Sequence, residues 1–422
     1  MQTHRSHHAA SLAFLLALTL PALPACGEGK PERKHRHHRE ETASVETSEA
    51  TPAPVTPADP PAAAPAADPE KDKKHHKDKD GADGDKPKDG KDKDGKDSKK
   101  ADKRTHDHTA KPTDVQWLLT MHGEEGKPQG IWGITGEGQL QGPLNQPIPD
   151  GPAGLVPHDL RGLTPLPDGG FLAMNAFSKD TRILRFGPKG TDGHYPYLGD
   201  FTKLGPGNPA MMHAYQMAIG ADGQVYVSNQ DSNTVTRYVG VGQPNAGEPL
   251  SPPLSMSHLA DLPPGVIVPN AKSSPEGIGE VRGIAFGPDG QLYVCDRTGS
   301  RVSAYDTATG RRTKVVADRS HGLQHPIQVA FTQDGASMFV GDNGTDSIFK
   351  VELATGTVST FVPKGAAGLK APSALVIKGD WLFVGSREGK QVLKFRLKDG
   401  KADDKPFATL PDNPEFLMWV GD

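Results

Sequence analysis

Three features of the 422-residue sequence predict an all-β protein, a six-bladed β-propeller with four antiparallel strands per blade. The first is a recurring hairpin in which two short apolar runs flank an Asp-Gly turn. The second is its spacing, because four strands in each stretch of about 45 residues are typical of a propeller blade. The third is a pair of incomplete copies, one at each end of the repetitive region.

The clearest hairpin is RGIAFGPDGQLYVCD, residues 282–296. Its Gly supplies the positive φ that the tight turn requires, and the Pro before Asp presets the backbone. Further copies begin at Arg161, Tyr215 and Ile327, and a looser one begins at Ser373. A third strand such as RILRF or SIFKVEL follows each hairpin, and TGRRTKVV and TGTVSTFV are fourth strands.

The two chain ends are expected to build one blade together. First strands begin near His158, His213, Glu280, His325 and Ala371. A sixth, PEFLMWV (residues 414–420), has nothing after it, whereas QWLLTMH and GIWGITGEG look like second and third strands without a first. Joining them closes a ring of six and removes an exposed sheet edge.

The first 25 residues predict an export signal. Arg5 precedes an apolar run over residues 9–20, which is too short to span a bilayer. The run ends in LPAC, which resembles the lipobox of bacterial lipoproteins and implies lipid on Cys26; the alternative is ordinary cleavage beside a chance cysteine. The resemblance predicts a protein exported to the cell envelope and anchored to a membrane through Cys26. Cys295 would then have no disulfide partner.

Residues 26–113 are predicted to be a disordered tether. No Leu, Ile, Val, Met or aromatic residue occurs between Thr56 and Asp114, and residues 27–113 hold 20 basic and 20 acidic residues. Such a segment buries too little apolar area to fold. Its His-containing patches either bind metal or an anionic wall polymer, or belong to a solvated spacer.

Residues 114–422 form the predicted propeller, which we expect to be monomeric. They hold 27 basic and 32 acidic residues without a basic stripe, so a nucleic-acid partner is not expected. The stretches GPDGQLYVCD and GADGQVYVSNQDSNTVTRY resemble six-bladed propellers of the NHL-repeat and gluconolactonase-like (senescence marker protein-like) superfamily. That resemblance covers about 300 residues and implies the fold, which hosts lactonases, lyases, hydrolases and binding modules.

Strand order predicts two faces. The starts of the innermost strands and the ends of the second strands share one face, which we call the entry face; the Asp-Gly turns lie on the opposite one, the turn face. The turn aspartates, expected to be turn formers only, are Asp168, Asp222, Asp289 and Asp334. The polar residues ending the second strands, expected to cap the next turn, are His122, Asn175, Asn229, Asp296, Asp342 and Ser386.

The candidate site is the ring of residues at the starts of the innermost strands. The candidates for binding a ligand are Arg161, Tyr215, Gln216, Arg282, Gln328, Ser373 and Glu415. Those for binding zinc or calcium are His158, His213, His325 and Glu280. The second set resembles the zinc site of propeller amidoglycolate lyases, which bind the metal through histidines of several blades. Gluconolactonase-like enzymes hold a divalent ion through Glu, Asn and Asp. Of these three ligands, this sequence matches only the Glu, with Glu415.

Arg161 and Arg282 have two interpretations. Their planar guanidinium groups would suit an anionic ligand, or they form structural salt bridges with Asp159 or Glu280. Two functions remain open. One is a membrane-tethered module that binds a protein, a glycan or a small anionic ligand; the other is a metal-dependent lactonase or lyase. The sequence has no G-x-S-x-G, metalloprotease-helix or phosphate-loop motif.

Overall fold

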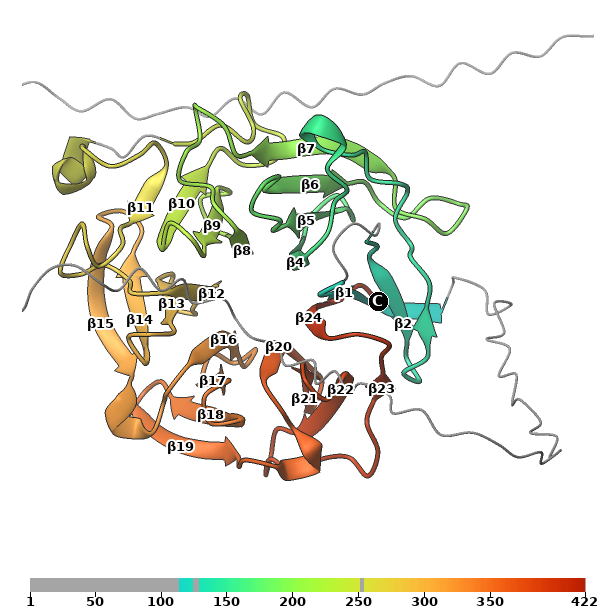
Figure 1. The fold of residues 1–422 in the computed structure, drawn as a ribbon. Helices are drawn as coiled ribbons and strands as arrows, with labels where there is room; N and C mark the ends of the chain where they lie inside the picture. The colour runs from blue at the N-terminus through green and yellow to red at the C-terminus, as the bar shows by residue number, and fades with distance from the viewer. Residues whose placement is uncertain (1–113, 124–128, 251–253, 422) are drawn as a thin grey trace, which may run out of the picture. The chain divides into compact units, whose positions relative to one another are not determined.

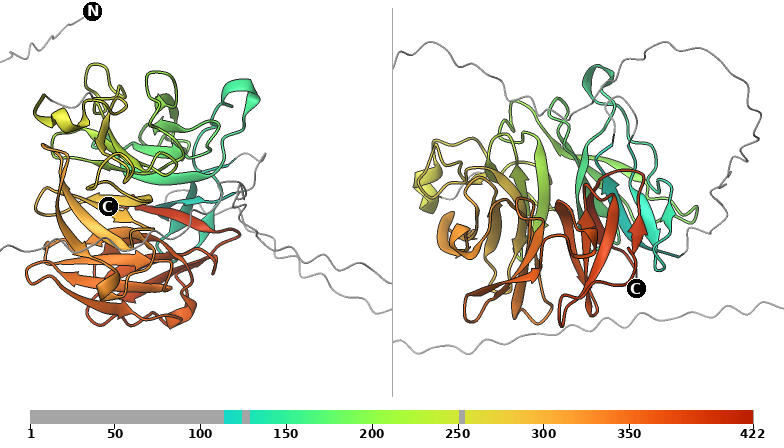
Figure 2. Two further views of the ribbon diagram at one scale, coloured as in Figure 1. Left: turned by 60° about the vertical axis from the view of Figure 1, so that its left-hand side comes forward. Right: turned by 60° about the horizontal axis from the view of Figure 1, so that its bottom comes forward.

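A computed structural model describes residues 114–123, 129–250 and 254–421. These residues form six four-stranded antiparallel sheets arranged as the blades of a ring (Figure 1), which confirms the predicted propeller. Figure 2 shows the same ring from two other sides. The predicted signal peptide, Cys26 and the tether lie outside the described residues. No helix among the described residues is long and apolar enough to cross a membrane.

Both chain ends build one blade, the closing blade, as predicted. Its innermost strand β24 (Pro414–Trp419) pairs antiparallel with β1 (Val115–Met121), so that Met418 lies opposite Leu118. The sheet continues through β2 (Trp132–Thr135) to β3 (Leu140–Gln141). The ring is therefore closed by hydrogen bonds between the two ends of the domain.

The other five blades follow in chain order, each beginning at its innermost strand. Blade 1 contains β4 (Leu160–Pro165), β5 (Phe171–Asn175), β6 (Arg182–Phe186) and β7 (Tyr197–Lys203). Blade 2 contains β8 (Ala214–Ile219), β9 (Val225–Asn229), β10 (Thr234–Tyr238) and β11 (Val266–Val268). Blade 3 contains β12 (Val281–Phe286), β13 (Leu292–Asp296), β14 (Arg301–Asp306) and β15 (Arg311–Ala317).

Blade 4 contains β16 (Pro326–Phe331), β17 (Ser337–Asp342), β18 (Ser347–Glu352) and β19 (Thr357–Val362). Blade 5 contains β20 (Pro372–Lys378), β21 (Trp381–Ser386), β22 (Gln391–Arg396) and β23 (Ala408–Thr409). Short 3-10 turns occur at η2 (Pro152–Gly154), η3 (Leu254–Leu259), η4 (Arg319–His321) and η5 (Ala366–Gly368).

The core lies between the blades rather than at the centre of the ring. The buried apolar side chains of the described residues gather into six clusters, one at each seam between neighbouring blades. All four tryptophans of the chain belong to the cluster between blade 5 and the closing blade. Because each seam needs both of its blades to remove apolar surface from water, the ring is stable only when complete. Cys295 is buried with a free thiol.

Polar residues at the two ends of the second strands shape the turns, largely as predicted. On the turn face, each aspartate of an Asp-Gly turn accepts a hydrogen bond from a backbone N–H two residues further on. On the entry face, Asp296 and Asp342 accept from backbone N–H groups three residues on, and Asn175 donates to the carbonyl of Asp180. These side chains are therefore occupied in forming turns.

Candidate functional site

One backbone hydrogen bond, repeated in every blade, defines the entry face. The N–H of the residue after the second strand donates to the carbonyl of the residue before the innermost strand, at 2.8–3.1 Å. The residues before the innermost strands are Asp159, His213, Glu280, His325, Ala371 and Asn413. The residues after the second strands are Ala176, Gln230, Arg297, Asn343, Arg387 and His122. Side chains from equivalent positions of all six blades therefore surround the mouth of the ring.

Every innermost strand also has a β-bulge near its start. A bulge adds a residue to one strand and redirects the side chains beside it. In blades 1 and 3 a glycine follows the arginine at this position. A Cβ on Gly162 would lie 3.0 Å from the backbone of blade 2, and one on Gly283 would lie 2.6 Å from a carbonyl oxygen of blade 4. These glycines allow the innermost strands to approach closely.

A buried ion-pair network joins the closing blade to its neighbours. Arg161 places Nη2 2.7 Å from Oδ1 of Asp159 and Nη1 against Oε2 of Glu415. Arg387 Nε donates to Oε1 of Glu415 at 2.9 Å. His122 Nδ1 lies 3.2 Å from Asp159 Oδ1 and 3.4 Å from Glu415 Oε1. Because Arg161, Asp159 and Glu415 are at most 8% exposed, water screens these charges little.

His213 extends the network to blade 2. Its Nε2 lies 3.3 Å from Oδ2 of Asp159, and its Nδ1 lies 3.2 Å from Oδ1 of Asp231. Asp159 and His213 both have left-handed backbones, with φ of 58° and 48°. Such conformations are uncommon outside glycine and cost free energy, and they collect at sites where the surrounding structure holds a side chain in place. Here they set Asp159 between the two histidines.

The carboxylates keep both histidines protonated. The close contacts with the carboxylates of Asp159 and Glu415 raise the pKa of His122 to about 9. Burial alone would lower the pKa of His213, but the contacts with Asp159 and Asp231 outweigh burial and raise it to about 8. At neutral pH both imidazoles therefore carry positive charge, and His213 Nδ1 donates to Asp231.

The cations in turn keep the carboxylates ionised. Burial would raise the pKa of Glu415, but Arg161, His122 and Arg387 outweigh it and hold this pKa at about 2. Burial likewise opposes ionisation of Asp159, yet Arg161 and the two histidines bring its pKa well below the usual range. Because every carboxylate of this network is ion-paired, at neutral pH it offers cationic donors rather than a general base.

Blade 3 carries a second, smaller group of charges. Arg282 contacts Oε1 of Glu280 and donates to the carbonyl of Val281 at 2.8 Å. Arg297 Nη1 donates to both oxygens of Glu280 at 3.1 Å. The salt-bridge interpretation thus holds for both arginines, since Arg161 is also paired. With the histidines protonated, the larger network has four cations and three anions and this group has two cations and one anion, so the two groups together carry a net charge of +2.

Tyr215 lies between the two arginines. The guanidinium carbons of Arg161 and Arg282 are each 5.9 Å from the centroid of its ring. The residue is 4% exposed, and within the described part of the chain its hydroxyl has no hydrogen-bond partner. Burial raises its pKa, so the phenol stays neutral at physiological pH. The ring is thus buried between two cations, while its hydroxyl is not one of the buried polar atoms without a partner and can donate to a ligand at the mouth of the ring.

Three of the predicted ligand-binding residues connect neighbouring blades. Gln216 Oε1 accepts from the backbone N–H of Ile284 in blade 3 at 3.0 Å. Gln328 Oε1 accepts from the N–H of Leu375 in blade 5 at 2.7 Å. The hydroxyl of Ser373 donates to the carbonyl of Pro414 in the closing blade at 2.7 Å. These oxygens are occupied in holding innermost strands together.

The predicted metal ligands do not converge. His213 belongs to the network around Asp159, whereas the ring of His158 packs on Phe177 with centroids 3.9 Å apart. His325 lies before β16, and Glu280 is taken by Arg282 and Arg297. Among the described residues no group of three His, Cys, Asp or Glu side chains is placed to hold a metal ion. The donor set shown here therefore does not fit zinc or calcium.

Sequence reasoning missed part of the network. From the sequence, His122 is expected only to cap a turn, and Asp159 is expected at the start of an innermost strand and as a possible salt-bridge partner. Arg387 and Asp231 are not among the expected residues. The sequence feature that points to some of these residues is the position directly after each second strand. In three blades this position is occupied by a residue that can carry a positive charge: His122, Arg297 and Arg387. That position pairs with the start of the innermost strand in every blade, so charges there meet charges at the entry.

Comparisons with known proteins agree with the architecture. No family model and no curated protein matches the chain. A chain from the crystal structure of a nidogen/laminin complex matches with a TM-score of 0.50 and 14% identity, over 73% of this chain and 98% of that one. A putative 6-phosphogluconolactonase from Bacteroides fragilis matches with a TM-score of 0.48 and 17% identity, over 76% and 100% of the two chains.

The periplasmic gluconolactonase PpgL of Pseudomonas aeruginosa matches with a TM-score of 0.45 and 14% identity, over 73% and 99%. At such identities the similarity concerns the fold. It identifies no family for this chain, so the chemistry must be argued from the residues themselves.

Proposed function

We propose that this chain is a binding module whose propeller takes a small anionic ligand at the entry face. The observation that carries the proposal is Tyr215, whose ring lies beside the guanidinium groups of Arg161 and Arg282 and whose hydroxyl makes no hydrogen bond within the described residues. A carboxylate or phosphate oxygen placed there would accept from the phenol. It would also gain from the net positive charge of the surrounding residues.

The rim of the entry face supports the same ligand class. The side chains of Arg387, Arg297 and His122 are 31%, 35% and 41% exposed, so each presents a cationic donor to solvent although it is also ion-paired. Charge-assisted hydrogen bonds of this kind each contribute about 1.5–3 kcal/mol when they are made. A ligand with several anionic or carbonyl oxygens, such as a sugar acid or a wall fragment, would use more than one of them.

The test is a ligand-observed NMR screen of sugar acids, lactones and wall fragments against the full-length protein. Arg282→Ala and Arg297→Ala should each weaken binding by an amount on the order of 1.5–3 kcal/mol. Asp222→Ala, in a turn on the opposite face, should leave affinity unchanged and serves as the control. If the turn variant lost affinity and the arginine variants did not, the ligand would bind to the other face.

We further propose that lipid on Cys26 holds the propeller in the cell envelope at the end of the tether. The support is the LPAC sequence after an apolar leader. Cys26→Ser should then move the protein from the membrane fraction to the soluble fraction without changing the unfolding transition of the propeller. A variant that stayed with membranes after a high-salt wash would show that the anchor lies elsewhere.

The metal-dependent lactonase or lyase is the alternative, and metal analysis separates it from the binding module. Zinc or calcium at one equivalent in the purified full-length protein, lost together with activity on a lactone upon chelation, would favour the enzyme. It would also mean that the ion pairs around Asp159 and Glu415 rearrange, because each carboxylate is occupied by arginine and histidine.

A further inference from the structure

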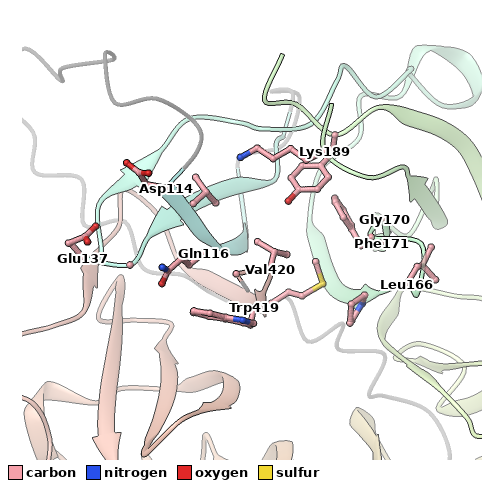
Figure 3. A pocket seen from close by; sticks show the side chains of 16 residues that line it. Asp114, Gln116, Glu137, Leu166, Gly170, Phe171, Lys189, Trp419 and Val420 are labelled. Atoms are coloured by element: carbon pink, nitrogen blue, oxygen red, sulfur yellow. The ribbon is translucent and has the colours of Figure 1, made fainter. Parts of the chain in front are cut away.

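A cavity lies on the turn face, away from the charge network. Its volume is about 660 Å³, within the range of roughly 300–1,000 Å³ that small-molecule sites occupy. It is lined by the start of β1, the end of β24, the β4–β5 turn of blade 1 and the residues Lys189 and Tyr195. Figure 3 shows Asp114, Glu137 and Gln116 along one side, with Phe171 and Leu166 on the other.

The topology explains why a cavity forms here. In blades 1–5 a tight turn joins the innermost strand to the second strand and covers the turn face. In the closing blade the same two strands are β24 and β1, which come from opposite ends of the domain and share no turn. Two chain ends thus replace one hairpin turn, and both of them line the cavity.

Four polar side chains around the cavity have hydrogen-bonding capacity to spare, and one of them is Trp419, whose buried indole N–H has no partner within the described residues. Tyr195 is 5% exposed, and its hydroxyl makes no hydrogen bond within the described residues. Its ring is held edge-on against Phe171 at 5.1 Å, and its backbone pairs with Leu144 and Gln146, so the phenol is fixed in place. The side chains of Gln116 and Glu137 likewise have no hydrogen-bond or ion-pair partner among residues 114–123, 129–250 and 254–421.

The charge of the lining disfavours an anion. Asp114 and Glu137 contribute two negative charges, and Lys189, which interacts electrostatically with Asp114, contributes one positive charge. The net charge is therefore −1, opposite in sign to the entry face. The apolar lining residues Phe171 and Met418 are at most 5% exposed, so the apolar surface of the cavity comes mainly from exposed Pro165 and from half-buried Trp419 and Val420.

We infer that this cavity is a second binding site, for a neutral or amino-bearing carbohydrate of about disaccharide size. A sugar presents many hydroxyl groups that both donate and accept, which suits a phenol, a carboxamide and a carboxylate around one cavity. An ammonium group on the sugar would pair with Glu137. Because residues from both chain ends line the cavity, the bound sugar bridges the two segments that close the ring.

The experiment titrates the full-length protein with cellobiose, chitobiose bearing free amines, and glucuronate, observed by saturation-transfer NMR. We expect cellobiose and chitobiose to bind and glucuronate to bind more weakly than either. Tyr195→Phe and Gln116→Ala should each weaken cellobiose binding about threefold to tenfold, the effect of losing a neutral hydrogen bond. Glu137→Gln should weaken chitobiose more than cellobiose, because only chitobiose carries a cation.

The matched control is Tyr197→Phe, in the same blade, where the hydroxyl donates to Asp200 outside the cavity. This variant, and Arg282→Ala on the entry face, should bind cellobiose as the unchanged protein does. Hydrogen exchange should also slow in β1 and β24 when cellobiose is bound. The inference is overturned if neither disaccharide binds at millimolar concentration, if glucuronate binds best, or if Tyr195→Phe binds as well as Tyr197→Phe.

Discussion

Two kinds of contact hold neighbouring blades together on the entry face. Ion pairs connect the closing blade to blades 1 and 5, whereas neutral side-chain amides connect blade 2 to blade 3 and blade 4 to blade 5. Glu415 of the closing blade pairs with Arg161 of blade 1 and Arg387 of blade 5. Gln216 and Gln328 instead accept from a backbone N–H of the next blade. The second residue of β24 and the third residues of β8 and β16 thus connect neighbouring blades through two kinds of chemistry.

The difference follows from how the ring closes. Each of blades 1–5 has a covalent turn between its two inner strands, so the innermost strand is already positioned when it meets its neighbour. The innermost strand of the closing blade, β24, is held to β1 by hydrogen bonds alone. Ion pairs act over longer distances than hydrogen bonds, and they hold this strand on both sides. They also titrate, whereas amide contacts do not, so the two kinds of seam can be separated by experiment.

The largest effect should come from removing β24 itself. Deletion of residues 413–422 exposes the apolar clusters at two seams and opens the ring, so we expect no cooperative folding. Circular dichroism during urea unfolding and size-exclusion chromatography measure the outcome. A truncated protein that remained monomeric with a sharp unfolding transition would show that closure does not need the C-terminal strand.

Glu415→Ala should destabilise the propeller by about 3–5 kcal/mol, because it leaves the buried Arg161 with half of its partners and Arg387 with none. The free energy of unfolding in urea gives the measurement. The matched control is Glu276→Ala, which removes an exposed partner of Arg311 and should cost at most about 1 kcal/mol. Equal costs for the two variants would contradict the role of charge at this seam.

Gln328→Ala should cost less, about 1–3 kcal/mol, since it leaves one buried backbone N–H, that of Leu375, without its acceptor. The same urea titration applies. Unlike the loss from Glu415→Ala, this loss should not depend on pH between 5 and 9, because an amide does not titrate. A pH-dependent cost would mean that the neutral seam is coupled to the charge network.

The charged seams should also respond to pH, which the neutral seams should not. His122 and His213 have folded-state pKa values of about 9 and about 8, above the ordinary value near 6.5. Their stabilisation is complete below about pH 6.5 and is lost as the pH rises through 8 to 9. The stabilisation from the ionised carboxylate of Glu415 is complete above its ordinary pKa near 4.3 and is lost as the pH falls toward 2.

Stability measured from pH 5 to 10 should therefore decline on the alkaline side. The decline should be smaller in His122→Asn, which has no imidazolium to deprotonate. Identical alkaline profiles for the variant and the unchanged protein would show that the network does not hold His122 protonated.

Much of the entry face followed from strand order, and its bonding did not. The order of apolar runs was enough to place Arg161, His213, Arg282 and Glu415 at the starts of innermost strands, where the structure has them. Whether a given arginine is free or paired depends on the bulges and on the left-handed backbone at Asp159. A bulge or a left-handed residue cannot be recognised from this sequence alone, because Asp159 and Leu160 are equally compatible with a regular strand start.

The sequence by itself determined the hairpins, the number of blades and the closing of one blade by both termini. These depend on local turn chemistry and on the alternation of apolar residues along a strand, which each segment carries within itself. Only the tertiary structure decided that Glu415 meets Arg161 and Arg387, and that Tyr195 borders a cavity beside both chain ends. Those contacts join residues that are distant along the chain, and their geometry is set by the packing of neighbouring blades.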